Sequence, residues 1–402
     1  MNKKVCAGLD VHKDSVFAAI SKGSNASEVK EFSTLTCSIK ELCSWLISEG
    51  VKEVAMESTG IYWVPIWNIL EAAGFKLMLV NPYFIKQMPG RKSDVKDAQW
   101  IALLLTKELL KGSLVPSTQI RTLRAYSREY VKLQQQITRV VQSIERILES
   151  ANIRITSMTS RIESKTVLKI VSKIIEGETD IDKLYALVHG RIKNSKGEKV
   201  KHSLEGFIKE EHRIILGLRM EEYEMYFKQA ELVENKMIEI SEVYFKREIE
   251  ILKTMPGVAT QSAIQLIAET GGDMTQFSSS NKITRWAGLC PRNDESAGKI
   301  KSKATTKGNS YLRRIIVQIA WASSRTKGSH FQSQFQHLAV RKGNKKALIA
   351  VARKQLAVAW NMLRNNMPYD PTKQPVYSQE QIKAKKKHHE KELKKLALYL
   401  DN

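Results

Sequence analysis

Four carboxylates in the first quarter of the chain have the types and the spacing of a metal site. Asp10 stands in LDVHKD and Glu57 in VAMESTG, and each accompanies an apolar run that predicts a β-strand. Asp94 and Asp97 stand in RKSDVKDA, three residues apart at the predicted start of a helix, and therefore point to one face. Hard cations prefer oxygen ligands, so four acids converging from two strands and a helix predict a site for one or two Mg²⁺ ions.

The charge of the chain indicates which substrate such a site would meet. The 402 residues include 65 Lys and Arg against 42 Asp and Glu, which gives a net charge of +23. We therefore expect a phosphodiester substrate and a polyanionic partner, DNA or RNA. No apolar run approaches the length of a membrane span and no signal peptide precedes the first strand, which predicts a cytoplasmic protein with no membrane partner. The four cysteines have neither zinc spacing nor a secreted framework, which favours reduced thiols.

The elements that must position the acids form a predicted α/β domain over residues 1–112. The expected order is β-β-β-α-β-α-β-α, which fits a mixed sheet of the ribonuclease-H kind, with the first strand supplying an acid from mid-sheet. Ser93 is expected to cap the helix that carries the acid pair. The predicted strands are 5–9, 15–21, 29–32, 53–56 and 75–80, and the other predicted helices are 39–48 and 60–73.

Residues 113–250 are expected to form a helical coiled-coil arm. Two apolar seams with spacings of three and four predict two long antiparallel helices, with a loop near 176–206 at the tip. The arm can pack on itself or pair with a second copy, and we favour contacts between copies. The first seam contains Leu123, Tyr126, Tyr130, Leu133, Ile137, Val140, Ile144 and Ile147, and the second contains Tyr223, Tyr226, Ala230, Val233, Met237, Ile240 and Tyr244.

Residues 251–370 are expected to form a mostly helical third domain, followed by a basic tail over 371–402. KTMPGVATQSAIQLIAETGG predicts a helix-hairpin-helix-like element, whose turn would offer backbone N–H groups to a DNA phosphate. An ordinary packed pair of helices explains the same pattern. A basic loop without acids then leads into a helix from Ser310, and the last long helix is expected over 345–362. The basic residues predicted to contact nucleic acid are Arg292, Lys299, Lys301, Lys303, Lys307, Arg313 and Arg314.

Ser296 in NDESAGK lies in a predicted loop just before the basic residues. A serine nucleophile needs a base or a metal to activate it, and no histidine lies near it in the sequence. Spacing alone therefore favours an ordinary turn residue, unless the acidic cluster of the first domain activates it.

Six segments, in order, resemble the DEDD transposases of the insertion-sequence one-ten family, which are related to the Piv-type DNA invertases. The resemblance covers about 5–110 and 250–367 and includes both the acid motifs and the serine loop, whereas the middle matches only as a helical spacer. Ala259 and Ala297 stand where the family often has glycine. The segments are LDVHKDS, AMESTGIYW, NPYFIKQMPGRKSDVKDAQWIA, MPGVATQSAIQLIAE, WAGLCPRNDESAGK and TKGNSYLRR.

The resemblance implies a RuvC-like first domain, a coiled coil and a C-terminal transposase domain. It implies that Asp10, Glu57, Asp94 and Asp97 are catalytic metal ligands and that Ser296 is the nucleophile. It further implies a phosphoserine link to DNA, an active site shared between protomers of a dimer or tetrameric synapse, and selection of donor and target DNA by a structured noncoding guide RNA from the same element.

The expected function is therefore an RNA-guided, Mg²⁺-dependent DNA recombinase acting as a transposase in the cytoplasm, at the nucleoid. Two alternatives stay open. One is a metal-only RuvC-like nuclease that resolves DNA junctions by water attack, with Ser296 incidental. The other is a noncatalytic scaffold that binds nucleic acid through its basic surface alone.

Overall fold

The structure is a computed structural model that divides into two compact units, residues 1–116 and 117–402, which are described separately. The side chains of residues 94–96, 294–296 and 299–301 lie outside the description, as do Ser93, Lys303 and most of the predicted tail. The described residues are 5–22, 28–57, 60–82, 94–159, 161–292, 294–296, 299–302, 304–373, 386–387, 390 and 393.

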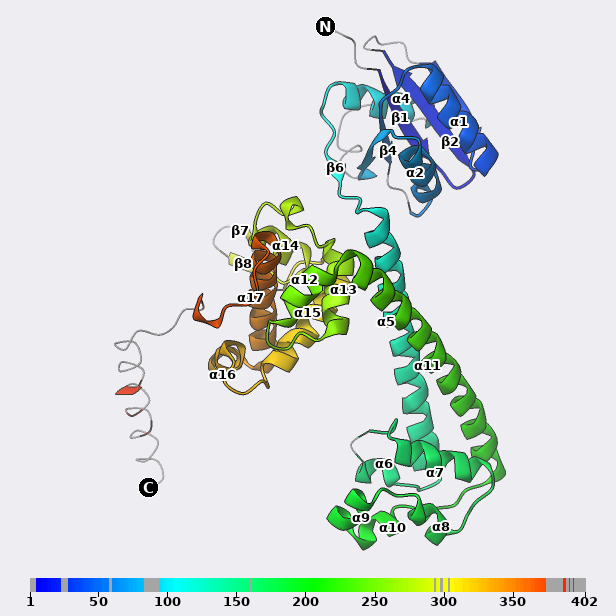
Figure 1. The fold of residues 1–402 in the computed structure, drawn as a ribbon, viewed down its shortest axis with the longest axis vertical. Helices are drawn as coiled ribbons and strands as arrows, with labels where there is room; N and C mark the ends of the chain where they lie inside the picture. Colours follow the sequence, from blue (N-terminus) through cyan, green and yellow to red (C-terminus); the bar gives the residue numbers. More distant parts are fainter. Residues whose placement is uncertain are drawn as a thin grey trace. The chain divides into compact units, whose positions relative to one another are not determined.

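A six-stranded mixed sheet forms the middle of the first unit (Figure 1). The strands lie in the order β3-β2-β1-β4-β5-β6; β1 to β3 are antiparallel, β4 and β5 run parallel to β1, and β6 is antiparallel to β5. The predicted order of strands and helices is confirmed, and β6 is an addition. The strands are β1 (Cys6–Val11), β2 (Ser15–Ser21), β3 (Glu28–Ser33), β4 (Glu53–Glu57), β5 (Lys76–Val80) and β6 (Gly112–Ser113).

Both faces of β1 are covered, because every residue of this strand is buried. Side chains alternate along a strand, so Ala7, Leu9 and Val11 share one face, where they join a core with residues of α1 (Thr36–Ser48) and α2 (Trp63–Ala72). Cys6, Gly8 and Asp10 share the other face, which α4 (Asp94–Thr106) covers. The acid on β1 therefore points to the side of the sheet that carries the helix of the acid pair.

The second unit is helical and begins with two long helices, α5 (Thr118–Ser150) and α11 (Glu210–Tyr244), which pack along each other. The seam residues Leu133, Ile137 and Val140 of α5 share a core with Tyr223 and Ala230 of α11. The two predicted seams thus pack on each other within one chain, and the contacts between copies that the sequence analysis favoured stay a prediction.

The predicted loop over 176–206 is wrong, because this segment is mostly helical. It contains three short helices, α8 (Ile181–Ala186), α9 (Gly190–Lys196) and α10 (Glu198–His202). Leu184, Val188, Val200 and Leu204 of this segment are buried in the same core as the helices α6 (Ile155–Met158) and α7 (Lys165–Ile175). The few apolar residues of this segment all face one core. Because they are so few, their pattern in the sequence does not predict helices.

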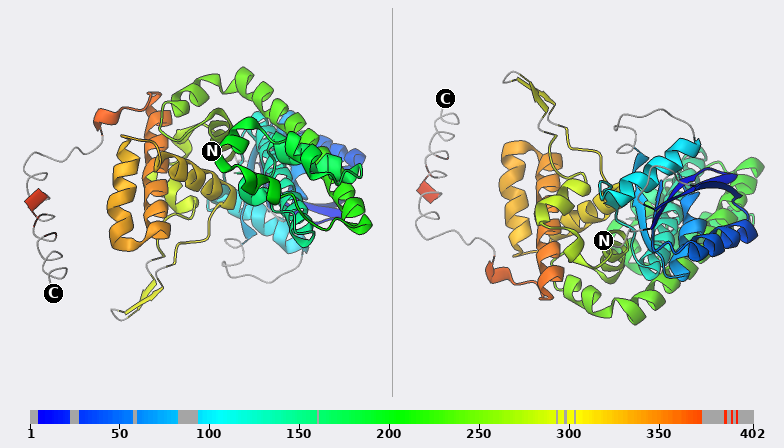
Figure 2. Two further views of the ribbon diagram at one scale, coloured as in Figure 1. Left: turned by 90° about the horizontal axis from the view of Figure 1, so that it is seen from below. Right: turned by 90° about the horizontal axis from the view of Figure 1, so that it is seen from above.

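In the described residues up to 365, six α-helices and one hairpin follow (Figure 2). In the turn before α13, Gly257 has a φ of +86°, and a Cβ there would lie 2.6 Å from the Ile319 carbonyl oxygen, so glycine permits this turn to pack on α15.

Ser296 ends a strand rather than standing in a loop. The helices are α12 (Lys246–Lys253), α13 (Thr260–Thr270), α14 (Ser280–Trp286), α15 (Ser310–Ser323), α16 (His330–Lys342) and α17 (Asn344–Asn365), and the hairpin strands are β7 (Asp294–Ser296) and β8 (Lys299–Ser302).

None of the helices in the described ranges combines the length and the apolar character needed to cross a membrane.

Candidate active site and the network that positions it

Asp10 and Glu57 meet at one edge of the sheet because their strands are parallel and in register. Leu9 on β1 pairs with Met56 on β4, and the two acids are the next residue on each strand. Parallel neighbouring strands end at the same edge, so both carboxylates are presented there. The pairing of strands thus brings together two acids that are 47 positions apart in the sequence, as their numbers show.

The helix α4 runs back along β1 and brings its first turn to the same edge. Cys6, at the start of β1, shares a cluster with Leu105 near the end of α4. Gly8 touches the α4 backbone, since a Cβ there would lie 2.4 Å from the Ala98 carbonyl oxygen. The N-terminal turn of α4, with Asp94 and Asp97, therefore lies toward the Asp10 end of β1.

Asp10 is the electrostatic centre of this group. Burial raises the pKa of its carboxyl to about 6, the neighbouring His12 opposes this rise, and the negative charges of Glu57 and Asp97 add to it. Glu57 and Asp97 therefore lie near enough to Asp10 for their charges to act on its carboxyl. The Asp94 side chain lies outside the described residues.

The donor set fits a hard divalent cation. It consists of carboxylate oxygens at a site where burial and mutual repulsion oppose the ionised state, and a bound cation relieves that repulsion. Within the described side chains, however, no three His, Cys, Asp or Glu lie close enough to hold an ion by themselves. The described side chains thus supply the donor chemistry of a cation site but not its geometry.

His12 is a candidate site residue that the sequence interpretation did not include in the site. Its Nε2 lies 3.1 Å from Oδ2 of Asp10, and its side chain is 45% exposed. The signal in the sequence was the spacing of two from Asp10, which places both residues on one side of an extended chain. The imidazole favours the ionised form of Asp10 and lowers its pKa.

Ser296, the predicted nucleophile, is the last residue of β7. It pairs with Lys299 on β8, in a hairpin that Figure 2 shows projecting from the helices around it. Ser296 belongs to the second unit and the acids to the first, so their pairing stays a prediction.

The predicted basic contacts divide into exposed and internal residues. Arg292 and Lys307 are exposed, whereas Arg313 donates hydrogen bonds to the Gly288 carbonyl oxygen at 2.7 Å and to Thr305 Oγ1 at 2.8 Å. Arg313 thus fastens the chain after β8 to the turn after α14. Arg314 is half-buried, and Lys299, Lys301 and Lys303 have no described side chains.

A buried carboxylate, Glu269 of α13, joins the start of the arm to the segment that follows the hairpin. Arg128 of α5 donates to both of its oxygens at 2.9 and 3.0 Å, and Asn309 donates to Oε2 at 2.6 Å. Arg124 adds hydrogen bonds to the carbonyl oxygens of Ala268 and Glu269. The Asn309 side chain also accepts from the Leu312 N–H and so caps α15.

These four residues, Arg124, Arg128, Glu269 and Asn309, form a positioning network that the sequence interpretation missed. Glu269 is 1% exposed, and the Arg128 guanidinium also lies 4.7 Å from the centre of the Tyr311 ring. The only local signal was a carboxylate at the end of an apolar helix in QLIAETGG. Its partners are too distant in the chain for spacing to reveal.

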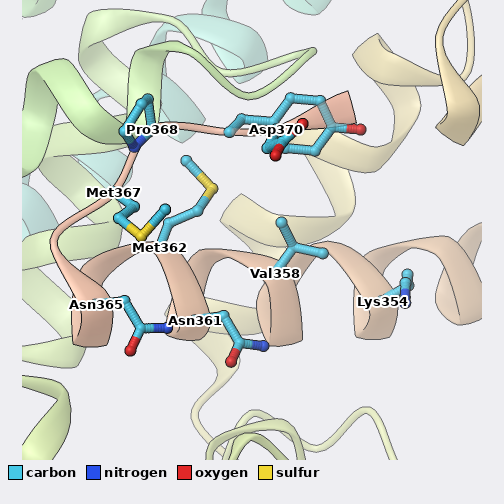
Figure 3. A pocket seen from close by; sticks show the side chains of 9 residues that line it. Lys354, Val358, Asn361, Met362, Asn365, Met367, Pro368 and Asp370 are labelled. Atoms are coloured by element: carbon cyan, nitrogen blue, oxygen red, sulfur yellow. The ribbon is translucent and has the colours of Figure 1, made fainter. Parts of the chain in front are cut away.

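A small pocket of about 280 Å³ lies between the end of α17 and the segment after it (Figure 3). Its lining includes Lys354, Met362 and Asp370. None of the predicted site residues lines it, so we assign it no function.

Known proteins resemble this chain in two separate segments. The family described as "Transposase IS116/IS110/IS902 family" matches residues 249–336, and the DEDD transposase family of IS110 matches residues 7–153, together more than half of the chain. These matches define the class, a transposase of insertion sequences. The chain belongs to the IS116/IS110/IS902 family.

Individual relatives agree with this family. An "Insertion element IS900 uncharacterized 42 kDa protein" from Mycobacterium paratuberculosis is 33% identical over 31% of this chain and 32% of that protein. The "Pilin gene-inverting protein" of Moraxella bovis is 28% identical over 30% of this chain and 38% of its own length. A "Transposase for insertion sequence element IS1111A" from Coxiella burnetii is 28% identical over 29% and 33%. The chain spans about a third of the length of these relatives.

Proposed function

We propose that this protein is a metal-dependent DNA recombinase that moves an insertion sequence through a covalent phosphoserine intermediate. The observation that carries the proposal is the parallel register of β1 and β4, which puts the buried Asp10 and Glu57 at one edge of the sheet, with Asp97 near enough to act on the charge of Asp10. The family supports DNA as the substrate, since relatives are named as transposases and as a gene-inverting protein.

One or two Mg²⁺ ions would be held by Asp10, Glu57, Asp94 and Asp97. The ions would stabilise the charge of the pentacoordinate phosphorus in the transition state and acidify a coordinated oxygen. Ser296 Oγ attacks the phosphorus, its proton passes to a base, and the leaving 3′-oxygen becomes a free 3′-hydroxyl. A second 3′-hydroxyl then attacks the serine ester, which restores the serine and joins the new strands. Each step exchanges one phosphate ester for another, so no ATP is required. Arg292 and Lys307 would hold the DNA backbone beside the serine.

The test is covalent trapping on a plasmid that carries the element with its own flanks and its noncoding RNA. The wild-type protein should give an SDS-stable protein–DNA adduct. Ser296→Ala and Asp10→Ala should both abolish the adduct, whereas Ser302→Ala on the other strand of the same hairpin should preserve it.

The outcomes separate three functions. Strand cutting without an adduct, unaffected by Ser296→Ala, would establish a metal-only nuclease. Binding with steep salt dependence but neither cutting nor adduct would establish a noncatalytic scaffold. Removal of RNA by ribonuclease should stop recombination if a guide RNA directs it, and recombination in RNA-free conditions would reject guidance.

We further propose that the active site is assembled from two protomers, with the acids of one meeting Ser296 of another, in a dimer or a tetrameric synapse at the nucleoid. An exposed apolar stripe on α11 supports a contact between copies. Leu218, Met225 and Leu232 repeat every seven residues and are 50%, 45% and 63% exposed. A seven-residue repeat keeps one face toward a partner helix.

A further inference from the structure

A cleft of about 760 Å³ lies at the tip of the arm, between α7, the end of α8 and α11. None of the predicted catalytic or nucleic-acid-binding residues lines it, and the family matches cover neither of its two principal helices, α7 and α11. Its walls combine an aromatic pair with lysines, two groups that serve different parts of one ligand. The lining residues used below are Glu163, Lys165, Lys169, Lys173, Tyr223, Glu224, Phe227 and Lys228.

The aromatic pair is Tyr223 and Phe227, one helical turn apart on α11. Their ring centres lie 6.0 Å apart with 27° between the ring planes. Tyr223 is 8% exposed and Phe227 is 52% exposed, so the first is anchored and the second offers its ring to the cleft and to solvent. An exposed aromatic beside a cleft provides a surface on which a planar ligand stacks, and nucleobases of any sequence have such a face.

The lysines form a row beside the rings. Lys165, Lys169 and Lys173 are exposed on α7 at spacings of four, which places successive ammonium groups on one face at steps of about 6 Å along the helix. The opposite face of α7 is buried in the core, so the helix cannot rotate and the three lysines stay on its exposed face. Lys228 adds a fourth charge from α11. Such a row matches a chain of evenly spaced phosphates.

The balance of charge favours an anionic ligand. Four lysines line the cleft against two carboxylates, Glu163 and Glu224. Lys173 pairs with Glu176, but in the described part of the chain no carboxylate lies within ion-pair distance of Lys165, Lys169 or Lys228. Three lysines therefore keep their charge available to a ligand.

We propose that this cleft binds a single-stranded polynucleotide, with bases stacked on Phe227 and phosphates along the Lys165–Lys169–Lys173 row. A single strand meets both requirements, since its bases are unpaired and its backbone is extended and charged. A duplex hides its base faces and leaves the exposed ring without a partner. The proposal rests on the proposed function only in that the protein handles nucleic acid, and it is independent of chemistry at Ser296.

The experiment locates the strand, because a chain of net charge +23 binds nucleic acid at many places. Oligouridylate and oligothymidylate of about twelve nucleotides, each with one 5-iodouracil, are crosslinked by light to the full-length protein, and the attached residue is mapped by mass spectrometry. We expect attachment to Phe227 or Tyr223. The two oligonucleotides separate RNA from DNA as the source of the strand.

Two variants test the same site by affinity. Phe227→Ala should weaken binding about tenfold, the range of one lost stacking contact. Lys165→Glu combined with Lys169→Glu should lower the slope of log K against log salt by about 1.4, corresponding to two phosphate contacts. Lys199→Glu, an exposed lysine of α10 outside the cleft, reverses one charge, half the change in the double variant, and should have less than half of its effect on the affinity and on the salt slope.

Crosslinks that map only to other elements, or equal effects of the cleft variants and Lys199→Glu, would overturn the proposal. A change of mass in light scattering with Phe227→Ala, without loss of crosslinking, would show that the cleft binds a second copy instead. Ser296→Ala should leave crosslinking unchanged, so failure of the phosphoserine chemistry and failure of this site are distinguishable.

Discussion

Arg128 of α5 and Glu269 of α13 form a two-pronged ion pair across 141 positions of the chain, with N–O distances of 2.9 and 3.0 Å. The pair fixes the base of the arm to the helix whose end carries Glu269, and Asn309 extends the same connection to the start of α15. Asn309 follows the hairpin that ends in β8. One carboxylate therefore links the base of the arm to the segment that follows the serine hairpin.

Removing Arg128 should destabilise the second unit far more than removing an exposed lysine. Arg128→Ala leaves the fully buried Glu269 carboxylate with Asn309 as its remaining side-chain donor, and we expect a loss of about 2–3 kcal/mol in the free energy of unfolding. Lys132→Ala, which breaks an exposed pair with Glu129 one turn along α5, should cost far less, because solvent screens this pair. Denaturant unfolding measures both, and equal losses would show that the pair contributes no more than surface charge.

The sequence predicted the first unit well because its signals are local. The apolar residues around Asp10 and before Glu57 identify two strands. The two acids meet at one edge of the sheet because β1 and β4 are parallel. The helix of Asp94 and Asp97 was found from its apolar spacing. The role of His12 was missed because a turn residue beside Asp10 has no pattern of its own.

Two parts of the second unit were not predictable from the same signals. The helices α8 to α10 are short and carry few apolar residues, so periodicity has no length over which to appear. The partnership of Arg128 and Glu269 depends on α5 and α13 packing together, which is a tertiary contact. The long seams of α5 and α11, by contrast, were visible because burial repeats over many turns.

Gly8→Ala should disrupt the acid site without touching any acid. A Cβ at Gly8 would lie 2.3 Å from the Ala102 amide nitrogen and 2.4 Å from the Ala98 carbonyl oxygen, both backbone atoms, so α4 must move away from β1. We expect a loss of about 2–3 kcal/mol in stability and at least a tenfold loss of adduct formation.

Gly112→Ala is the matched control for Gly8→Ala. Gly112 lies on β6 of the same sheet, and the added Cβ would meet the flexible Met78 side chain at 3.0 Å. The free energy of unfolding and the adduct yield of Gly112→Ala should stay close to those of the wild type. If Gly8→Ala behaves like Gly112→Ala, the close approach of α4 to β1 is not required for the site.

Asp10→Asn should stabilise the metal-free protein at alkaline pH. The pKa of Asp10 is raised to about 6 in the folded protein from an ordinary value of 3.8, so the folded state favours the protonated carboxyl. Its stabilising contribution is complete below about pH 4 and is lost as the pH rises through 6. The variant should therefore be more stable than wild type by about 1–2 kcal/mol at pH 8 and nearly equal at pH 4, as measured by thermal unfolding in EDTA.

The exposed carboxyl of Asp14 provides the control for Asp10→Asn. Asp14→Asn removes an exposed charge close to Asp10 in the sequence. The difference in stability between pH 4 and pH 8 should therefore stay as in the wild type. Added Mg²⁺ should stabilise the wild type and the Asp14 variant more than Asp10→Asn, because binding to the folded state alone raises its stability. If Asp10→Asn were stabilised at pH 4 as much as at pH 8, the effect could not come from ionisation of the Asp10 carboxyl.

Leu232→Glu should dissociate the copies of the protein that meet through α11. Leu232 is the most exposed member of the stripe that it forms with Leu218 and Met225, and a carboxylate at the centre of an apolar helix contact is left unpaired and desolvated. Multi-angle light scattering should show a shift toward the monomer mass, and adduct formation should fall if the active site is shared. Asn194→Glu adds the same charge at an exposed position of α9 and should leave the mass unchanged. Equal masses for both variants and wild type would reject α11 as the contact between copies, while leaving the chemistry of Asp10 and Ser296 open to the trapping experiment.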